Sequence, residues 1–146
     1  MDFYNLESNK TFLVTIKGVL VRDGRVLLLR STAPHKQWEL PGGLINMDES
    51  FAEGLIREFK EETTLDVTVG DPIWASDDWR KNFKFNDGSV RDARVVEVMY
   101  LCTMLSEKDI VLSDEHSEYK WATSDDVDSL PMFLYQSRPL KERVFI

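Results

Sequence analysis

The sequence predicts an α/β fold in which a mixed sheet carries one well-marked helix. Apolar runs rich in β-branched residues recur along the chain, and Asp-Gly pairs at residues 23–24 and 87–88 separate neighbouring runs. Such pairs are typical of hairpins, whose strands are antiparallel. A helix is indicated at residues 50–62, where apolar side chains recur at helical spacing. We therefore expect a mixed sheet with helical cover and not an all-parallel sheet.

The first part of the chain has the pattern of a hairpin, a loop and a short strand. Residues 12–21 and 26–30 are the hairpin strands, and Gly18 within the first indicates a bulge or a close approach of another element. Residues 31–37 are polar and are expected to form a loop. Residues 38–43, Trp-Glu-Leu-Pro-Gly-Gly, are expected to form a short strand that leads into the helix, and their proline stiffens this approach.

The helix is predicted to begin with a capping box, in which Ser50 and Glu53 satisfy backbone groups of the first turn. Helical spacing places four apolar residues on one stripe, which is expected to dock on the core. These residues are Ala52, Leu55, Ile56 and Phe59.

A second face of the helix carries Glu58, Glu61 and Glu62 as neighbours. Like charges at these spacings destabilise a helix by about 0.2–0.5 kcal/mol per pair. A divalent cation relieves this repulsion, because Mg²⁺ prefers oxygen ligands and shares them with substrate phosphates. Arg57 and Glu49 lie where they can brace the carboxylates. The alternative is a solvated acidic face, which three glutamates alone leave open.

Residues 43–65 resemble the signature of the Nudix hydrolases, Gly-x5-Glu-x7-Arg-Glu-apolar-x-Glu-Glu-x-Gly-apolar. The fixed positions agree except at Thr64, where the family has glycine. Threonine adopts a left-handed helix cap reluctantly, so we expect a changed helix exit with the metal chemistry intact. The resemblance implies a Nudix-type α/β/α sandwich with a mixed sheet, formed by residues 1–146 as one domain, with the signature helix after Gly42 and Gly43.

The second part of the chain adds strands and short helices. Three strands are predicted: residues 66–76 with a kink at Gly70, residues 94–104 as a central strand, and residues 118–122. Ser124 is expected to cap a helix that runs to Leu130. The tail is expected to form a further helix that Pro139 interrupts.

The resemblance implies hydrolysis of a nucleoside diphosphate linked to another moiety, with Mg²⁺, or alternatively Mn²⁺, as the cofactor. The implied metal ligands are the carbonyl of Gly42 and the carboxylates of Glu58, Glu61, Glu62 and Glu115. Glu115 lies on the loop before Trp121, where some family members carry an additional ligand or base glutamate. Its rivals are Glu118 and Glu97, although Glu97 lies in an alternating strand and is expected to face outward.

The expected catalytic residues are Glu49, Arg57, Glu61 and Glu115. Glu49 braces Arg57 or orients the metal ligands; the alternative is a simple charge at the helix N-terminus. Arg30, His35 and Lys36 are candidates for contacts with phosphate, and Trp79, Phe83 and Phe85 are candidates for stacking on a base, which contributes roughly 1–3 kcal/mol per base. The alternatives are exposed loop positions for the first group, and packing or a dimer contact for the aromatic residues.

Composition limits the class of protein. The 146 residues carry a formal net charge of −8, which disfavours a nucleic-acid duplex as partner. No apolar run approaches the ~20 residues of a membrane span, and residues 1–7 lack the features of a signal peptide. Cys102 is the one cysteine, so we expect no disulfide framework and no cysteine nucleophile. We therefore expect a cytoplasmic protein that makes no membrane contact.

Among the activities in this class, nucleoside triphosphate pyrophosphohydrolysis ranks above hydrolysis of ADP-ribose or another nucleotide sugar. Two other classes stay open: a non-catalytic Nudix-like module that senses a nucleotide, and an acidic interaction protein with a coincidental motif. Metal-dependent turnover separates the enzyme from both. The expected partner is a small-molecule nucleotide, and a homodimer could form through residues 77–93 or a sheet edge.

Overall fold

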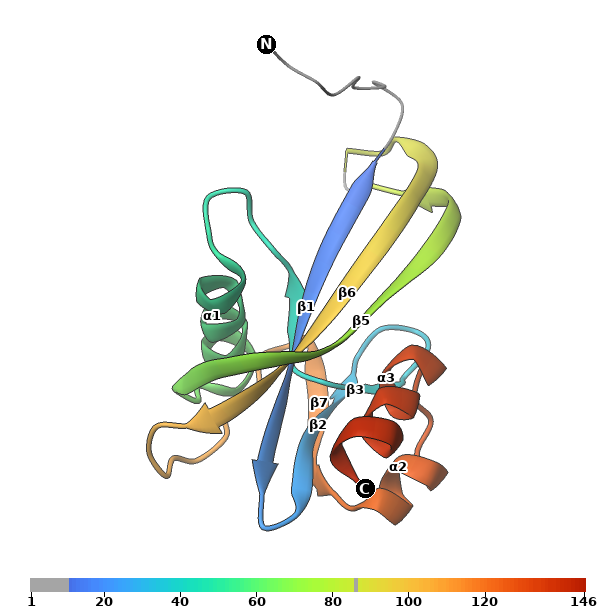
Figure 1. Ribbon diagram of the computed structural model, residues 1–146. Coiled ribbons are helices and arrows are strands. Elements are labelled where there is room, and N and C mark those ends of the chain that lie inside the picture. The colour runs from blue at the N-terminus through green and yellow to red at the C-terminus, as the bar shows by residue number, and fades with distance from the viewer. Residues whose placement is uncertain (1–10, 86) are drawn as a thin grey trace.

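The predicted hairpin is formed by β1 (Phe12–Arg22) and β2 (Arg25–Ser31) in the computed structural model of the chain (Figure 1). Its turn residues Asp23 and Gly24 have φ angles of 51° and 72°, as hairpin turns of this type require. The structure describes residues 11–85 and 87–146, so the segment at residues 1–7 lies outside the described residues.

A mixed sheet joins this hairpin to the other strands, as predicted. In the described part of the chain these are β3 (Trp38–Glu39), β4 (Gly42–Leu44), β5 (Val67–Lys84), β6 (Val90–Met104) and β7 (His116–Ala122). β1 runs parallel to β6 and antiparallel to β2 and β4. β2 also pairs with β3 and β7, and β6 pairs with β5. The predicted kink near Gly70 is present as a register shift between Val69 and Pro72.

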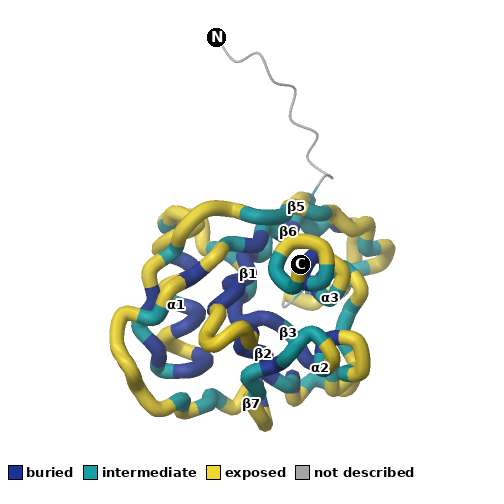
Figure 2. Tube along the Cα trace, turned by 60° about the horizontal axis from the view of Figure 1, so that its bottom comes forward, coloured by how far each residue is buried: buried dark blue, intermediate teal, exposed yellow. Residues whose placement is uncertain are grey.

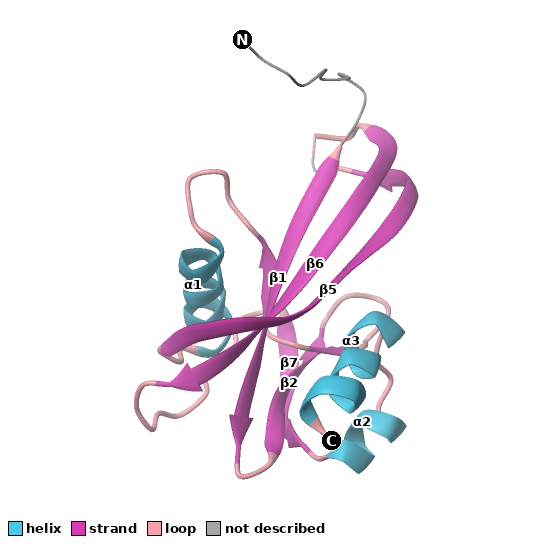
Figure 3. Cartoon of the chain, viewed as in Figure 1, coloured by secondary structure: helices cyan, strands magenta, loops and turns pink. Residues whose placement is uncertain are grey.

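Helices cover both faces of the sheet. α1 (Phe51–Thr63) lies on one face (Figures 1 and 3). The opposite face is covered by α2 (Ser124–Ser129), α3 (Leu134–Pro139) and the short π-helix η1 (Leu140–Val144). The α/β/α arrangement is therefore confirmed. Among the described residues, every helix is too short or too polar to cross a membrane.

Alternation along β1 and β2 divides the core between these two faces. Ile16 and Leu20 pack on the side of α1, where Gly18 leaves room for the ring of Phe59. Val19 and Leu28 pack on the side of α2 and η1. Successive strand residues point to opposite faces, so both sides of these strands are buried, as the dark segments in Figure 2 show.

α1 docks through a different face from the predicted stripe. The capping box is confirmed, because Ser50 Oγ accepts a hydrogen bond from the Glu53 N–H at 3.1 Å and Glu53 Oε1 accepts one from the Ser50 N–H at 3.3 Å. Ala52 and Ile56 are exposed, so the prediction was wrong for half of the stripe. The buried positions of the helix are Gly54, Leu55, Glu58, Phe59, Glu62 and Thr63. Carboxylates therefore share the docking face with apolar side chains.

The helix exit predicted to change is in fact preserved. Thr64 takes the left-handed conformation itself, with φ 66°, and its N–H bonds to the Lys60 carbonyl at 3.1 Å. The hydroxyl of Thr64 also donates to the Asp109 carbonyl at 3.2 Å. Threonine thus replaces the family glycine without a change of cap geometry.

Other boundaries also differ from the predictions. β5 continues to Lys84 instead of ending at residue 76, β6 begins at Val90 instead of residue 94, and β7 begins at His116 instead of residue 118. Residues 38–43 form two strands, β3 and β4, because a turn through Leu40 and Pro41 separates them. The cap of α2 is Thr123 and not Ser124, and Asp126 completes a capping box with it. Pro139 ends α3, and the chain continues directly into η1.

Candidate active site

Arg57 joins the carboxylates at the exposed end of the site. Its Nε and Nη2 donate to Glu49 at 2.9 and 2.7 Å, and its Nη1 donates to Glu58 at 3.0 Å and to Glu61 at 3.2 Å. The hydrogen bonds from Arg57 lower the pKa of Glu49 to about 2. Glu49 therefore stays ionised and holds the guanidinium in place. Glu61 lies at the rim, with a side chain that is 59% exposed.

Glu58 and Glu62 lie deeper, one helical turn apart. Gly43 lets the carboxylate of Glu58 approach β4, since a Cβ at Gly43 would lie 3.0 Å from Glu58 Oε1. Glu62 Oε2 accepts a hydrogen bond from the Gly42 N–H at 3.0 Å. Burial raises the pKa of both carboxyls, that of Glu62 to about 8. A positive charge at this position would favour their ionised forms.

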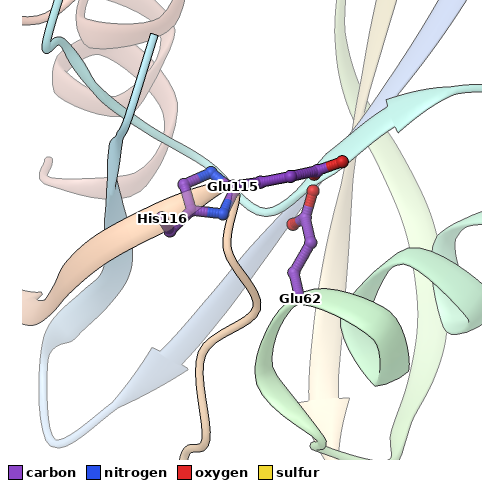
Figure 4. Close-up of side chains that lie close together, drawn as sticks. All are labelled: Glu62, Glu115 and His116. Carbon is purple, nitrogen blue, oxygen red and sulfur yellow. The ribbon is translucent and has the colours of Figure 1, made fainter.

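Glu115, just before β7, and His116, the first residue of β7, lie close to Glu62. Glu62, Glu115 and His116 each offer a ligand atom, and these atoms lie within 4.8 Å of one another. Figure 4 shows the carboxylates of Glu62 and Glu115 pointing toward each other from α1 and from the chain beside β7. Carboxylate oxygens and a histidine nitrogen are usual metal ligands. This cluster therefore could hold a divalent cation.

Sequence reasoning missed three polar residues in and beside the cluster, of which His116 and Lys17 are buried and Glu39 is partly exposed. His116 Nε2 lies 2.8 Å from Glu39 Oε1, so Glu39 orients the imidazole. Lys17 is 7% exposed and points its ammonium at backbone carbonyls of residues 40 and 42. Two features of the sequence could have pointed to these residues: a lysine within the apolar run of β1, and a histidine next to Glu115.

Glu97 is buried, contrary to the expectation that it faces outward. It is 6% exposed, and burial raises its pKa to about 7. Glu97 Oε1 has no hydrogen-bond partner in the described part of the structure. The alternating pattern of the strand assumes that one face of the sheet is open to water. Glu97 is buried because β6 lies between β1 and β5 and helices cover both faces of the sheet.

A cavity of about 210 Å³ adjoins the acidic cluster on the side of the sheet that carries α3. Its lining includes Lys17, Glu39, Glu97, Phe83 and Tyr135. Glu39 also lines a shallower hollow with Glu115 and His116, so it lies between the cavity and the cluster.

Of the candidates for substrate contact, Phe83 lines this cavity and the others lie in different surroundings. Arg30 pairs with Glu118 at 2.9 Å, and both side chains are partly exposed. His35 packs against Phe133, and Lys36 bonds to the Thr32 carbonyl. The rings of Trp79 and Phe85 lie beneath the guanidinium groups of Arg94 and Arg91.

Cys102 packs in the core on the side of α1. Burial raises the pKa of its thiol to about 12. A thiol held in its neutral form is a poor nucleophile.

The fold and this acidic helix define a Nudix-type domain. The NUDIX domain family matches residues 13–144, and the chain belongs to that family. A MutT protein from Methanosarcina mazei Go1 shares the fold at a TM-score of 0.74 and 24% identity, over 93% of this chain and 95% of that one.

Two curated relatives match shorter segments. A MutT-like protein of Streptomyces ambofaciens is 47% identical over 57 residues, which are 38% of this chain and 36% of the relative. The CTP pyrophosphohydrolase of Escherichia coli (strain K12) is 37% identical over 61 residues, which are 40% of this chain and 45% of the enzyme. The matches thus span less than half the length of these two relatives.

Proposed function

We propose that this protein is a divalent-cation-dependent hydrolase of the phosphoric anhydride bond in a nucleotide, with a nucleoside triphosphate as the preferred substrate class. The products are then a nucleoside monophosphate and pyrophosphate. The observation that carries the proposal is the cluster of Glu62, Glu115 and His116 beside the buried carboxylate of Glu58. The related CTP pyrophosphohydrolase supports the substrate class.

The residues present fit Mg²⁺ or Mn²⁺. Burial holds the pKa of Glu62 near 8, and a cation is the partner that such a carboxylate needs. The ligands we propose are the carboxylates of Glu58, Glu61, Glu62 and Glu115 and the Gly42 carbonyl, with His116 as an addition. When bound, the metal polarises the phosphoryl group and lowers the pKa of water. Arg57, held by Glu49, keeps the helix carboxylates in position.

The remaining catalytic roles fall to side chains at the edge of the cluster. Glu115 is exposed and lies within 4.8 Å of the other ligand atoms, so its carboxylate can accept a proton from water that attacks phosphorus. Glu39 fixes the orientation of His116 through their hydrogen bond. We expect the substrate phosphates to bind beside α1, at this cluster.

The cavity next to the cluster is the proposed site for the base. Its volume of about 210 Å³ is below the ~300–1,000 Å³ of whole-ligand pockets, which suits one ring system and leaves the phosphates at the cluster. Phe83 offers an aromatic face there. The unpartnered Oε1 of Glu97 needs a donor, and an N–H of the base provides one.

The test is phosphate release, after coupling to pyrophosphatase and phosphatase, from a panel of nucleoside triphosphates, ADP-ribose and nucleotide sugars. Each compound is assayed with Mg²⁺ and with EDTA. We expect metal-dependent turnover that is highest for a nucleoside triphosphate. Preferred turnover of ADP-ribose would overturn the substrate class. Thermal stabilisation by a nucleotide without turnover would instead indicate a nucleotide sensor.

A further inference from the structure

Lys17 is a buried cation at the junction of the acidic cluster and the cavity. Its Nζ donates to the Leu40 carbonyl at 3.2 Å and to the Gly42 carbonyl at 3.1 Å. The side chain also lines the cavity. An ammonium group has three donors, so two of them satisfy the turn that leads into β4.

The backbone fixes this arrangement. Lys17 and Gly42 are register partners in the antiparallel pairing of β1 and β4. Gly42 has a φ of 132°, and a Cβ there would lie 2.0 Å from the Ile16 carbonyl oxygen. β4 can therefore lie this close to β1 only because residue 42 is glycine, and its carbonyl stays within reach of the lysine.

The charge of Lys17 acts on the carboxylates around it. Burial raises the pKa values of Glu62 and Glu97, and the nearby ammonium opposes that rise at both groups. Lys17 thus provides, within the protein, part of the positive charge that a metal would provide. It also holds the Gly42 carbonyl, which belongs to the proposed ligand set.

We propose that the Lys17 ammonium competes with the bound metal for the Gly42 carbonyl. When the metal occupies that carbonyl, the ammonium binds the substrate phosphates instead. This inference rests on the metal site of the proposed function. Two positive charges at one carbonyl repel strongly at low dielectric. Lys17 therefore leaves the carbonyl when a metal is bound, and its flexible stem places the ammonium toward the cavity that it already lines.

The experiment is calorimetric titration of the metal-free protein with Mn²⁺, in the absence of nucleotide, for wild type, Lys17→Met and Lys108→Met. Methionine keeps most of the length and the apolar body of the side chain and removes the charge. We expect Lys17→Met to bind Mn²⁺ roughly tenfold more tightly than wild type, because a like charge is gone. Lys108 pairs with Asp66 on the surface, and its variant should bind as wild type does.

Equal or weaker Mn²⁺ binding by folded Lys17→Met would overturn the inference, since a lysine that only supports the turn would weaken the site when lost. A second measurement needs no variant. The side-chain NMR signals of Lys17 in wild type should shift on saturation with Mg²⁺ while those of Lys108 stay unchanged. Unchanged Lys17 signals at saturation would also contradict the proposal.

The failure of this inference differs from failure of the proposed function. If wild type binds no Mn²⁺, the metal site itself is wrong. If wild type binds Mn²⁺ and turns over nucleotides but Lys17→Met binds the ion no more tightly, only the role of Lys17 is wrong. For the substrate role, folded Lys17→Met should raise KM at saturating Mn²⁺, and an unchanged KM would contradict that part of the inference.

Discussion

Arg57 shows how one residue can organise an acidic site. It contacts Glu49, Glu58 and Glu61, and the bonds to Glu49 raise its own pKa further above the usual range. The spacing of Arg57 from Glu49 and Glu61 along the chain was enough to predict that it braces carboxylates, because these contacts are local. The mutual repulsion of the carboxylates is thereby reduced without a metal ion.

Glu115 is the residue whose chemical role is tested most simply. Glu115→Gln keeps the shape and removes the basic carboxylate. We expect turnover to fall by at least ~10²-fold, the usual contribution of a general base. The stability of the fold should change by less than about 0.5 kcal/mol, because the side chain is exposed. Steady-state kinetics and thermal melting measure the two effects.

Glu118→Gln is the companion variant. Glu118 pairs with Arg30 on the surface, so its loss should leave turnover near that of wild type. If Glu115→Gln works at the wild-type rate and Glu118→Gln does not, the two assignments must be exchanged. If both variants are active, Glu97 becomes the candidate.

At the scale of the element, α1 was predicted in position and N-terminal cap but not in orientation or in its C-terminal cap. Its local signals, Ser50 and Glu53, depend on neighbours in sequence and were interpreted correctly. The docking face was misassigned because hydrophobic periodicity assumes that glutamates face water. Here Glu58 and Glu62 are buried with Phe59, since the helix presents its carboxylates to β4 and the cluster.

The C-terminus of α1 gives a prediction about stability. Thr64 takes a left-handed conformation that costs most residues about 1–2 kcal/mol. Thr64→Gly relieves this strain but loses the hydrogen bond to the Asp109 carbonyl, which offsets part of the gain. We expect the free energy of unfolding to rise by about 0.5–1 kcal/mol. Urea denaturation measures the change.

Thr68→Gly is the matched control for that variant. Thr68 is exposed on β5, where glycine brings no relief and weakens the strand, so this variant should lose about 0.5–1 kcal/mol. A similar loss of stability in both variants would show that Thr64 is not strained.

At the scale of the molecule, the sheet and its helical layers followed from local patterns and from the family signature, whereas the completed site did not. Glu115 and His116 reach Glu62 because β7 pairs with β2. Lys17 and Glu97 share the cavity because β1 runs parallel to β6. Such contacts join residues distant in sequence, and no local spacing encodes them. The buried charges were missed for this reason.

The central claim is that the buried carboxylates of α1 hold the catalytic metal. Glu62→Gln tests it most directly, because glutamine can still accept the hydrogen bond from the Gly42 N–H. Glu53→Gln is the control, since glutamine preserves the capping box.

The decisive measurement is Mg²⁺-dependent nucleotide hydrolysis by these two variants and wild type. We expect Glu62→Gln to lose more than ~10²-fold in turnover, the scale of losing a group that stabilises charge in the transition state. Without metal, its melting temperature should stay near that of wild type at neutral pH, because burial raises the pKa of Glu62 to about 8 and the amide then replaces a largely neutral carboxyl. Glu53→Gln should match wild type. Turnover by Glu62→Gln within a few-fold of wild type would contradict the account.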